Sequence, residues 1–169
     1  MSVILVYTGN GKGKTSASIG QAVRALGGGM RVAFYQYMKR DGAGGEHVVL
    51  RELLRDNFFA GGLGFFRKPE EFPAHREAAL GVTSRAEAAI PNLDMLVLDE
   101  ALYALKAEIL TRNELEKLMA LCEEHDTHLV LSGRDAPGWV CAAAHLVTEM
   151  TEIKHPYAQG IPAAKGIEF

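Results

Sequence analysis

Cysteine is scarce in this sequence, and its scarcity narrows the chemistry that the chain can support. Only Cys122 and Cys141 occur among 169 residues, too few and too far apart for a disulfide framework or a Cys-x-x-Cys metal site. Long apolar runs are also lacking, because no stretch approaches the roughly 20 residues that a membrane-spanning helix needs. We therefore expect a protein of the reducing cytoplasm that has no membrane partner.

The sequence also has no excess of positively charged residues. The formal net charge is -3 and the pI is about 6.1, so the molecule as a whole offers no positive field to nucleic acid. We expect no nucleic-acid partner. Because 48% of the residues are hydrophobic, a chain of this length can bury one substantial core. Residues 1–169 are expected to form a single domain.

Short apolar segments alternate with amphipathic ones along the chain. Strands are expected at residues 3–7, 31–38, 95–98, 128–133 and 145–154, with a further short candidate within 58–65. Strands separated by helices predict an α/β fold of the P-loop NTPase kind, with a mainly parallel central sheet flanked by helices.

Helix signals fill most of the intervals between these strands. The apolar stripe Ile19, Ala22, Val23 and Leu26 predicts a first helix that stops at the glycines of residues 27–29. Residues 48–54, an alanine-rich segment before residue 91 and a short segment at 136–144 are further candidates. Thr111 and Glu114 match a capping box at the start of another helix, whose apolar face is Leu115, Leu118, Met119 and Cys122.

The segment TGNGKGKTS, residues 8–16, lies where a phosphate-binding loop belongs, directly after the first strand and before the first helix. Its glycines allow backbone N–H groups to turn toward an anion, and the helix dipole adds positive potential. Lys14 can reach phosphate oxygens, and the Thr15 hydroxyl is placed to ligate magnesium. The predicted phosphate site comprises Gly9, Asn10, Gly11, Lys12, Gly13, Lys14, Thr15 and Ser16.

The match to the pattern G-x-x-x-x-G-K-[ST] is imperfect. Thr8 stands where the pattern has its first glycine, the loop glycine is Gly9, and Lys12 is an additional cation. The alternative interpretation is a glycine-rich turn that only caps a helix. Two lysines and three alternating glycines in this context favour the phosphate site.

Asp99 and Glu100 follow the apolar run 95–98, at the position where phosphate-loop proteins hold a carboxylate that binds magnesium directly or through water. We expect Thr15, Asp99 and Glu100 to bind Mg²⁺ or Mn²⁺. The alternative is a solvated acidic strand end.

Beyond the phosphate loop, the chain resembles the P-loop family of ATP:corrinoid adenosyltransferases. The segments that carry the resemblance are VYTGNGKGKTS at 6–16, FYQYMKRDGAGGE at 34–46, LDMLVLDEALYAL at 93–105, LSGRDAP at 131–137 and KHPYAQGIPAAKGIEF at 154–169. The resemblance implies that cobalt(I) of a corrinoid attacks the 5′ carbon of ATP and that the whole triphosphate departs. It also implies adenosylcobalamin as product, a homodimer, and a flavin-type reductase that supplies cobalt(I).

The resemblance assigns roles to particular residues. Lys14, Thr15 and Glu100 would be catalytic, with the nucleotide reversed in the loop relative to kinases. Arg134, Lys154 and His155 match family positions near the active site. For Arg134 the alternative is a surface charge after a strand, and for His155 a packed imidazole in an ordered tail.

The aromatic residues depart from the family pattern. The family has a phenylalanine and a nearby tryptophan that help displace the lower ligand of cobalt. Here Phe65 and Phe66 are present, but the only tryptophan is the distant Trp139. We expect the two phenylalanines to contact the corrinoid, and core packing is the alternative.

Two other functions stay open on the sequence. A P-loop kinase or ATP hydrolase acting on another small molecule would use the same loop and acids. A non-catalytic protein that binds ATP and corrinoid is the other, since the aromatic pair is incomplete.

Overall fold

The part of the chain that the structure describes forms a single six-stranded sheet in which every hydrogen-bonded pair of strands is parallel. The structure, a computed structural model, describes residues 1–167. In chain order the strands are β1 (Ile4–Thr8), β2 (Val32–Gln36), β3 (Phe58–Ala60), β4 (Met95–Asp99), β5 (His128–Ser132) and β6 (Leu146–Glu149). Their order across the sheet is β3-β2-β4-β5-β1-β6, which confirms the predicted parallel α/β fold.

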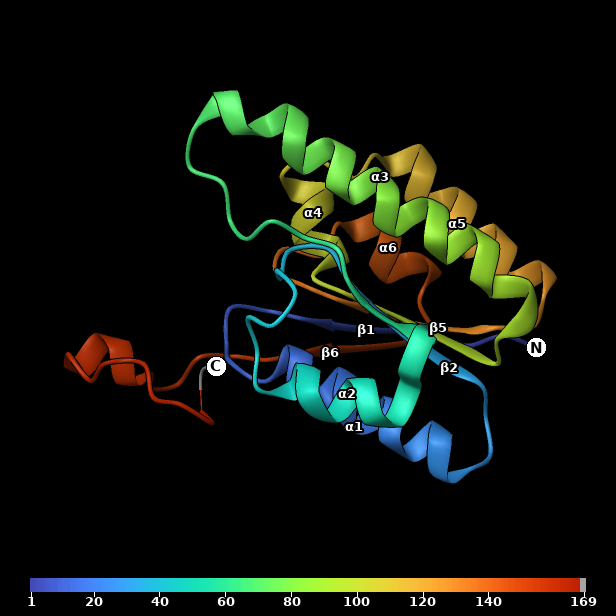
Figure 1. Ribbon diagram of the computed structural model, residues 1–169, viewed down its shortest axis with the longest axis horizontal. Helices are drawn as coiled ribbons and strands as arrows, with labels where there is room; N and C mark the ends of the chain where they lie inside the picture. Colours follow the sequence, from blue (N-terminus) through green and yellow to red (C-terminus); the bar gives the residue numbers. More distant parts are fainter. Residues whose placement is uncertain (168–169) are drawn as a thin grey trace.

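Helices cover both faces of the sheet (Figure 1). On one face lie α1 (Lys14–Gly27) and α2 (Glu46–Leu54), and on the other α3 (Phe72–Ala89), α4 (Ala101–Lys106), α5 (Arg112–Glu124) and α6 (Gly138–Ala143). Short 3-10 helices occupy Arg55–Asn57, Pro69–Glu71, Ile90–Asn92 and Pro156–Gln159. Within residues 1–167, no helix has both the length and the apolar character needed to cross a bilayer.

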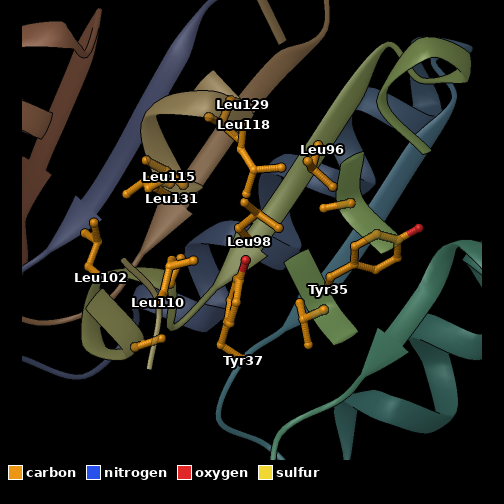
Figure 2. Packing of buried hydrophobic residues seen from close by; sticks show 14 of the residues in the cluster. Tyr35, Tyr37, Leu96, Leu98, Leu102, Leu110, Leu115, Leu118, Leu129 and Leu131 are labelled. Carbon is orange, nitrogen blue, oxygen red and sulfur yellow. The ribbon is translucent and has the colours of Figure 1, made fainter. Parts of the chain in front are cut away.

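The central strands β2 and β4 are buried along their whole length, as expected for strands with helices on both sides. Alternate residues point to opposite faces. Tyr35 and Leu98 join the larger apolar cluster beneath α3, α4 and α5, which Figure 2 shows at close range, whereas Phe34 and Val97 join the smaller cluster under α1 and α2. The sheet therefore carries two separate cores.

Three sequence predictions about these elements need correction. The buried face of α1 contains Ser18, Ala22 and Ala25, and Val23 is 48% exposed, so the predicted apolar stripe was partly wrong. β3 and β6 are shorter than the segments 58–65 and 145–154 predicted for them. The helix α4, only six residues long, was not predicted at all.

The carboxyl ends of the strands form one edge of the sheet, and the loops after β1, β2, β4 and β5 meet there. The C-terminal segment after β6 emerges at the same edge (Figure 1). Ligands of parallel α/β folds bind at this edge. The closing residues 168 and 169, which belong to one of the family-like segments, lie outside the described residues.

The capping box at the start of α5 is confirmed and gives a stability prediction. The Thr111 hydroxyl accepts the N–H of Glu114, whose side chain accepts the N–H of Thr111 at 2.8 Å. Thr111→Ala should lower the free energy of unfolding by about 1 kcal/mol, whereas Thr111→Ser, which keeps the hydroxyl, should cost less. Equal losses for both variants in urea denaturation would contradict a capping role for the hydroxyl.

Candidate functional site

The loop between β1 and α1 is hydrogen-bonded to the chain that follows the neighbouring strand β6. Gly9 and Gly13 adopt φ of 96° and 118°, a region that only glycine enters at low cost. The Gly11 N–H donates to the carbonyl of Met150 at 2.7 Å, and a Cβ on Gly9 or Gly11 would collide with that carbonyl. These glycines are thus required by the loop's shape and by its contact with the chain after β6.

Lys14 lies inside this loop with 7% of its surface exposed. Its ammonium donates to the carbonyls of Gly9 and Gly11, each at 2.8 Å. Burial lowers the pKa of Lys14, a change that the charge of Glu100 opposes. An ammonium has three donors, and with two used on the loop the third is left for an anion in the cavity that Lys14 lines.

Asp99 is the central buried acid of the site. Its carboxylate accepts the hydroxyl of Ser132 at 2.6 Å, the hydroxyl of Thr15 at 3.1 Å and the amide of Gln36 at 2.9 Å. Gln36 is the register partner of Asp99 on β2, and Ser132 ends β5 on the other side. The carboxylate is therefore fixed by both neighbouring strands and by the first turn of α1.

Glu100 lies one residue further, between β4 and α4. Its backbone has φ of 58°, and its N–H donates to the Ser132 hydroxyl at 2.9 Å. Burial raises the pKa of the Glu100 carboxyl, and the nearby charge of Asp99 raises it further. The side chain lines the same cavity as the phosphate loop.

This cavity measures about 410 Å³, within the range of small-molecule sites. It is lined by Lys12, Gly13, Lys14, Thr15, Ser16, Ile19, Lys39, Gly45, Glu46, Glu100, Gly166 and Ile167. Three lysines and a helix N-terminus facing one hollow suit a strongly negative ligand. The second half of the phosphate loop, Lys12–Ser16, lines this cavity together with Glu100, and Gly166 and Ile167 of the C-terminal segment form part of its wall.

A magnesium ion fits the residues present. The Thr15 hydroxyl and the Asp99 carboxylate already touch at 3.1 Å, and both are hard oxygen ligands of the kind that Mg²⁺ prefers. Among residues 1–167 no group of three or more His, Cys, Asp or Glu side chains is placed to hold an ion. Mg²⁺ is commonly held by one or two protein oxygens together with phosphates and waters, so this donor set is compatible with it.

Arg134, Lys154 and His155 do not line the cavity. Arg134 is exposed, but its charge influences both Lys14 and Glu100. Lys154 is exposed, and His155 accepts the N–H of Tyr157 through Nδ1 at 3.2 Å, capping the last 3-10 helix. This cap is consistent with the ordered-tail interpretation of His155.

The two phenylalanines have different surroundings. Phe65 is 62% exposed and packs edge-on against Tyr103 of α4, with ring centroids 4.9 Å apart. Phe66 is partly buried against the core and contacts Phe72 and His75. Phe65 is thus available to a ligand, and Phe66 chiefly supports the loop.

Sequence reasoning missed four site residues. Gln36 and Ser132 hold Asp99, while Lys39 and Glu46 line the cavity as an ion pair. Lys39 follows a buried strand much as Glu100 does, and this position at a strand's carboxyl end was the signal available in the sequence. Gln36 and Ser132 could be identified only once the strand order was known.

A family model and several curated proteins match nearly the whole chain. A family profile described as ATP:corrinoid adenosyltransferase BtuR/CobO/CobP matches residues 1–169. The corrinoid adenosyltransferase of Pseudomonas aeruginosa is 37% identical over 173 residues, covering 99% of this chain and 83% of the relative. The corrinoid adenosyltransferase CobA of Salmonella typhimurium is 32% identical over 169 residues, covering 99% of this chain and 85% of the relative.

Solved structures with little sequence identity share the fold. The flagellar accessory protein FlaH from Methanocaldococcus jannaschii is 12% identical with a TM-score of 0.56, covering 88% of this chain and 70% of that one. The replication initiator DnaA bound to AMPPCP and single-stranded DNA is 13% identical with a TM-score of 0.50, and the match covers 88% of this chain but only 40% of that one. On the strength of the profile and the curated relatives, the chain belongs to the ATP:corrinoid adenosyltransferase family BtuR/CobO/CobP.

Proposed function

We propose that this protein transfers the 5′-deoxyadenosyl group of ATP to cobalt(I) of a corrinoid and releases triphosphate. The observation that carries the proposal is the cavity in which the phosphate loop, three lysines and Glu100 face one another. Family membership and the curated relatives supply the reaction class. The loop supplies the place for the leaving group.

The proposed reaction is a nucleophilic substitution at carbon. An electron pair of cobalt(I) forms the bond to C5′ of ATP, the C5′–O bond breaks, and its electrons pass to the triphosphate. Cobalt becomes formally cobalt(III), and no proton has to be moved. Stabilising the departing charge is therefore the main task of the protein, which preorganised N–H groups and ammonium groups perform well.

Within the loop, Lys12, Lys14 and Ser16 are proposed to bind phosphate oxygens, together with backbone N–H groups other than that of Gly11, which donates to the Met150 carbonyl. Lys14 is the best placed of the side chains, because its ammonium is already fixed by two loop carbonyls. Fixed donors need little rearrangement as charge develops on the leaving group.

Mg²⁺ or Mn²⁺ is proposed to bind at Thr15, Asp99 and Glu100. When bound, the ion would neutralise part of the triphosphate charge. The protein's own contribution is to orient the Asp99 carboxylate through Ser132 and Gln36. Such supporting hydrogen bonds commonly tune the affinity of a metal site.

The corrinoid is proposed to bind beside the exposed ring of Phe65, with Arg134, Lys154 and His155 making polar contacts at the rim. Phe65 packs against Tyr103, which lies in α4, three residues after Glu100. The helix α4 therefore connects this aromatic surface to the nucleotide cavity. A homodimer, a flavin-type reductase as the source of cobalt(I), and a cytoplasmic location complete the proposal. Both cysteines are free, which suits a reducing compartment.

The reaction and its dependence on the loop are tested together. Under anaerobic conditions with ATP, Mg²⁺ and chemically reduced cobalamin, we expect a light-sensitive adenosylated product and free triphosphate. Lys14→Ala should lower turnover by about 100-fold or more, because it removes a cation from the leaving group. ADP as the product would instead indicate a kinase or hydrolase, and ATP binding without product would indicate a carrier.

Metal binding is tested at Thr15. Thr15→Val keeps the shape of the side chain but removes the hydroxyl, so the affinity for Mn²⁺ in the presence of ATP should fall roughly 10- to 100-fold. Electron paramagnetic resonance of free Mn²⁺ measures this affinity without turnover. Thr15→Ser is the matched control and should stay near the wild-type value; an unchanged affinity in Thr15→Val would exclude the hydroxyl as a ligand.

Alanine substitutions of Phe65 and Phe66 should affect different properties, corrinoid binding for Phe65 and stability for Phe66. Phe65→Ala removes an exposed ring and should raise the corrinoid KM roughly 3- to 10-fold, with ATP affinity unchanged. Phe66→Ala should mainly lower the melting temperature, because that ring packs on the core. A Phe65→Ala variant with the wild-type corrinoid KM would show that the corrinoid does not use this ring.

A further inference from the structure

Lys39 supplies a cation to the nucleotide cavity from outside the phosphate loop. It follows β2, lines the cavity together with Lys12 and Lys14, and its charge influences Glu100. Its ammonium contacts Oε1 of Glu46, an acid in the first turn of α2 that lines the same cavity. The side chains are 31% and 20% exposed, so the pair lies at the wall of the cavity rather than on open surface.

A buried histidine lies next to this pair with an unused donor. His47 is 1% exposed, and its Nδ1 accepts the N–H of Gly42 at 3.0 Å. The proton of the neutral ring is therefore on Nε2, and burial lowers the pKa of His47, which favours that neutral form. Among residues 1–167 Nε2 has no hydrogen-bond partner, and Oε1 of Glu46, the oxygen that Lys39 contacts, lies 3.9 Å away.

We propose that Lys39 binds the triphosphate of the nucleotide, and that its ammonium is paired with Glu46 until the nucleotide enters. When nucleotide enters, the Lys39 ammonium exchanges Glu46 for phosphate oxygens, and the released oxygen of Glu46 accepts the N–H of His47. The inference rests on the proposed function, since it takes the phosphates to lie in this cavity.

The exchange leaves each of the three side chains with a hydrogen-bond partner. A buried donor without an acceptor is unfavourable, so closing the 3.9 Å gap between His47 and Glu46 stabilises the state that has released Lys39. The ammonium meanwhile gains charge-assisted hydrogen bonds to a ligand that carries more charge than one carboxylate. The pair thus keeps the empty cavity from holding an unpaired cation and supplies that cation when the ligand arrives.

The two partners should have opposite effects on binding, which an ordinary structural salt bridge would not produce. Lys39→Gln should weaken ATP binding with Mg²⁺ about tenfold, because a charge-assisted bond is lost. Glu46→Gln removes the competitor for Lys39 and should tighten the same binding several-fold. Titration calorimetry with ATP, inorganic tripolyphosphate and adenosine gives the measurement; adenosine, which has no phosphate, should bind both variants as it binds the wild type.

Variants of His47 provide a second test of the exchange. His47→Phe keeps a ring against Phe58, whose centroid is 5.2 Å from that of His47, but offers no donor to the released carboxylate, so triphosphate affinity should fall several-fold. His47→Gln, which can place an amide N–H near the position of Nε2, should restore part of it. Melting temperatures report folding, and Lys117→Gln, which breaks an exposed ion pair with Glu87, should leave every affinity unchanged.

Weaker or unchanged triphosphate binding in a folded Glu46→Gln variant would overturn the inference, as would unchanged binding in Lys39→Gln. If Lys14→Ala abolishes binding while Lys39→Gln does not affect it, the inference that Lys39 binds triphosphate is wrong and the proposed function stands. If neither lysine matters, the cavity is not the triphosphate site and the proposed function fails with it.

Discussion

The site depends on one buried charge, the carboxylate of Asp99. A carboxylate removed from water is tolerated only where hydrogen bonds replace its solvation, and here those bonds come from Thr15, Gln36 and Ser132. Thr15, Gln36 and Ser132 are 84, 63 and 33 residues from Asp99 in the sequence, and they meet it because α1 packs on the sheet and β2 and β5 flank β4. Forming the site and forming the parallel sheet are therefore largely the same event.

Around that fixed point the protein arranges two kinds of positive charge. The ammonium of Lys14 is fixed by two carbonyls of its own loop, so its position does not depend on whether a ligand is bound. Lys39 is paired with an acid that lines the same cavity, and in the proposed exchange its ammonium changes partner when a ligand enters. A fixed donor stabilises the developing charge of a leaving group, and an exchangeable one is paired with Glu46 until a ligand enters.

Sequence reasoning identified the part of the site that is contiguous in the chain. The glycines and lysines of residues 8–16 and the acids at Asp99 and Glu100 were predicted because each motif carries its meaning within a few residues. Gln36 and Ser132 were not, because their role follows from the positions of β2 and β5 on either side of β4. The error at Val23 has a related cause: small residues such as Ala25 face the sheet in α1, and an apolar count cannot separate them from a larger exposed neighbour.

The least predictable element, α4, is the one that relates the two proposed substrate sites. Glu100 precedes it, Tyr103 in its first turn contacts Phe65, and the helix rests on Gly133, where a Cβ would approach the backbone N of Tyr103 to 2.7 Å. The absence of a side chain on Gly133, directly after β5, thereby allows α4 to pack close to the end of that strand. If the corrinoid binds beside Phe65, the distance between its cobalt and the ribose carbon of ATP is fixed by this short helix and the glycine beneath it, and the phosphate loop alone does not determine it.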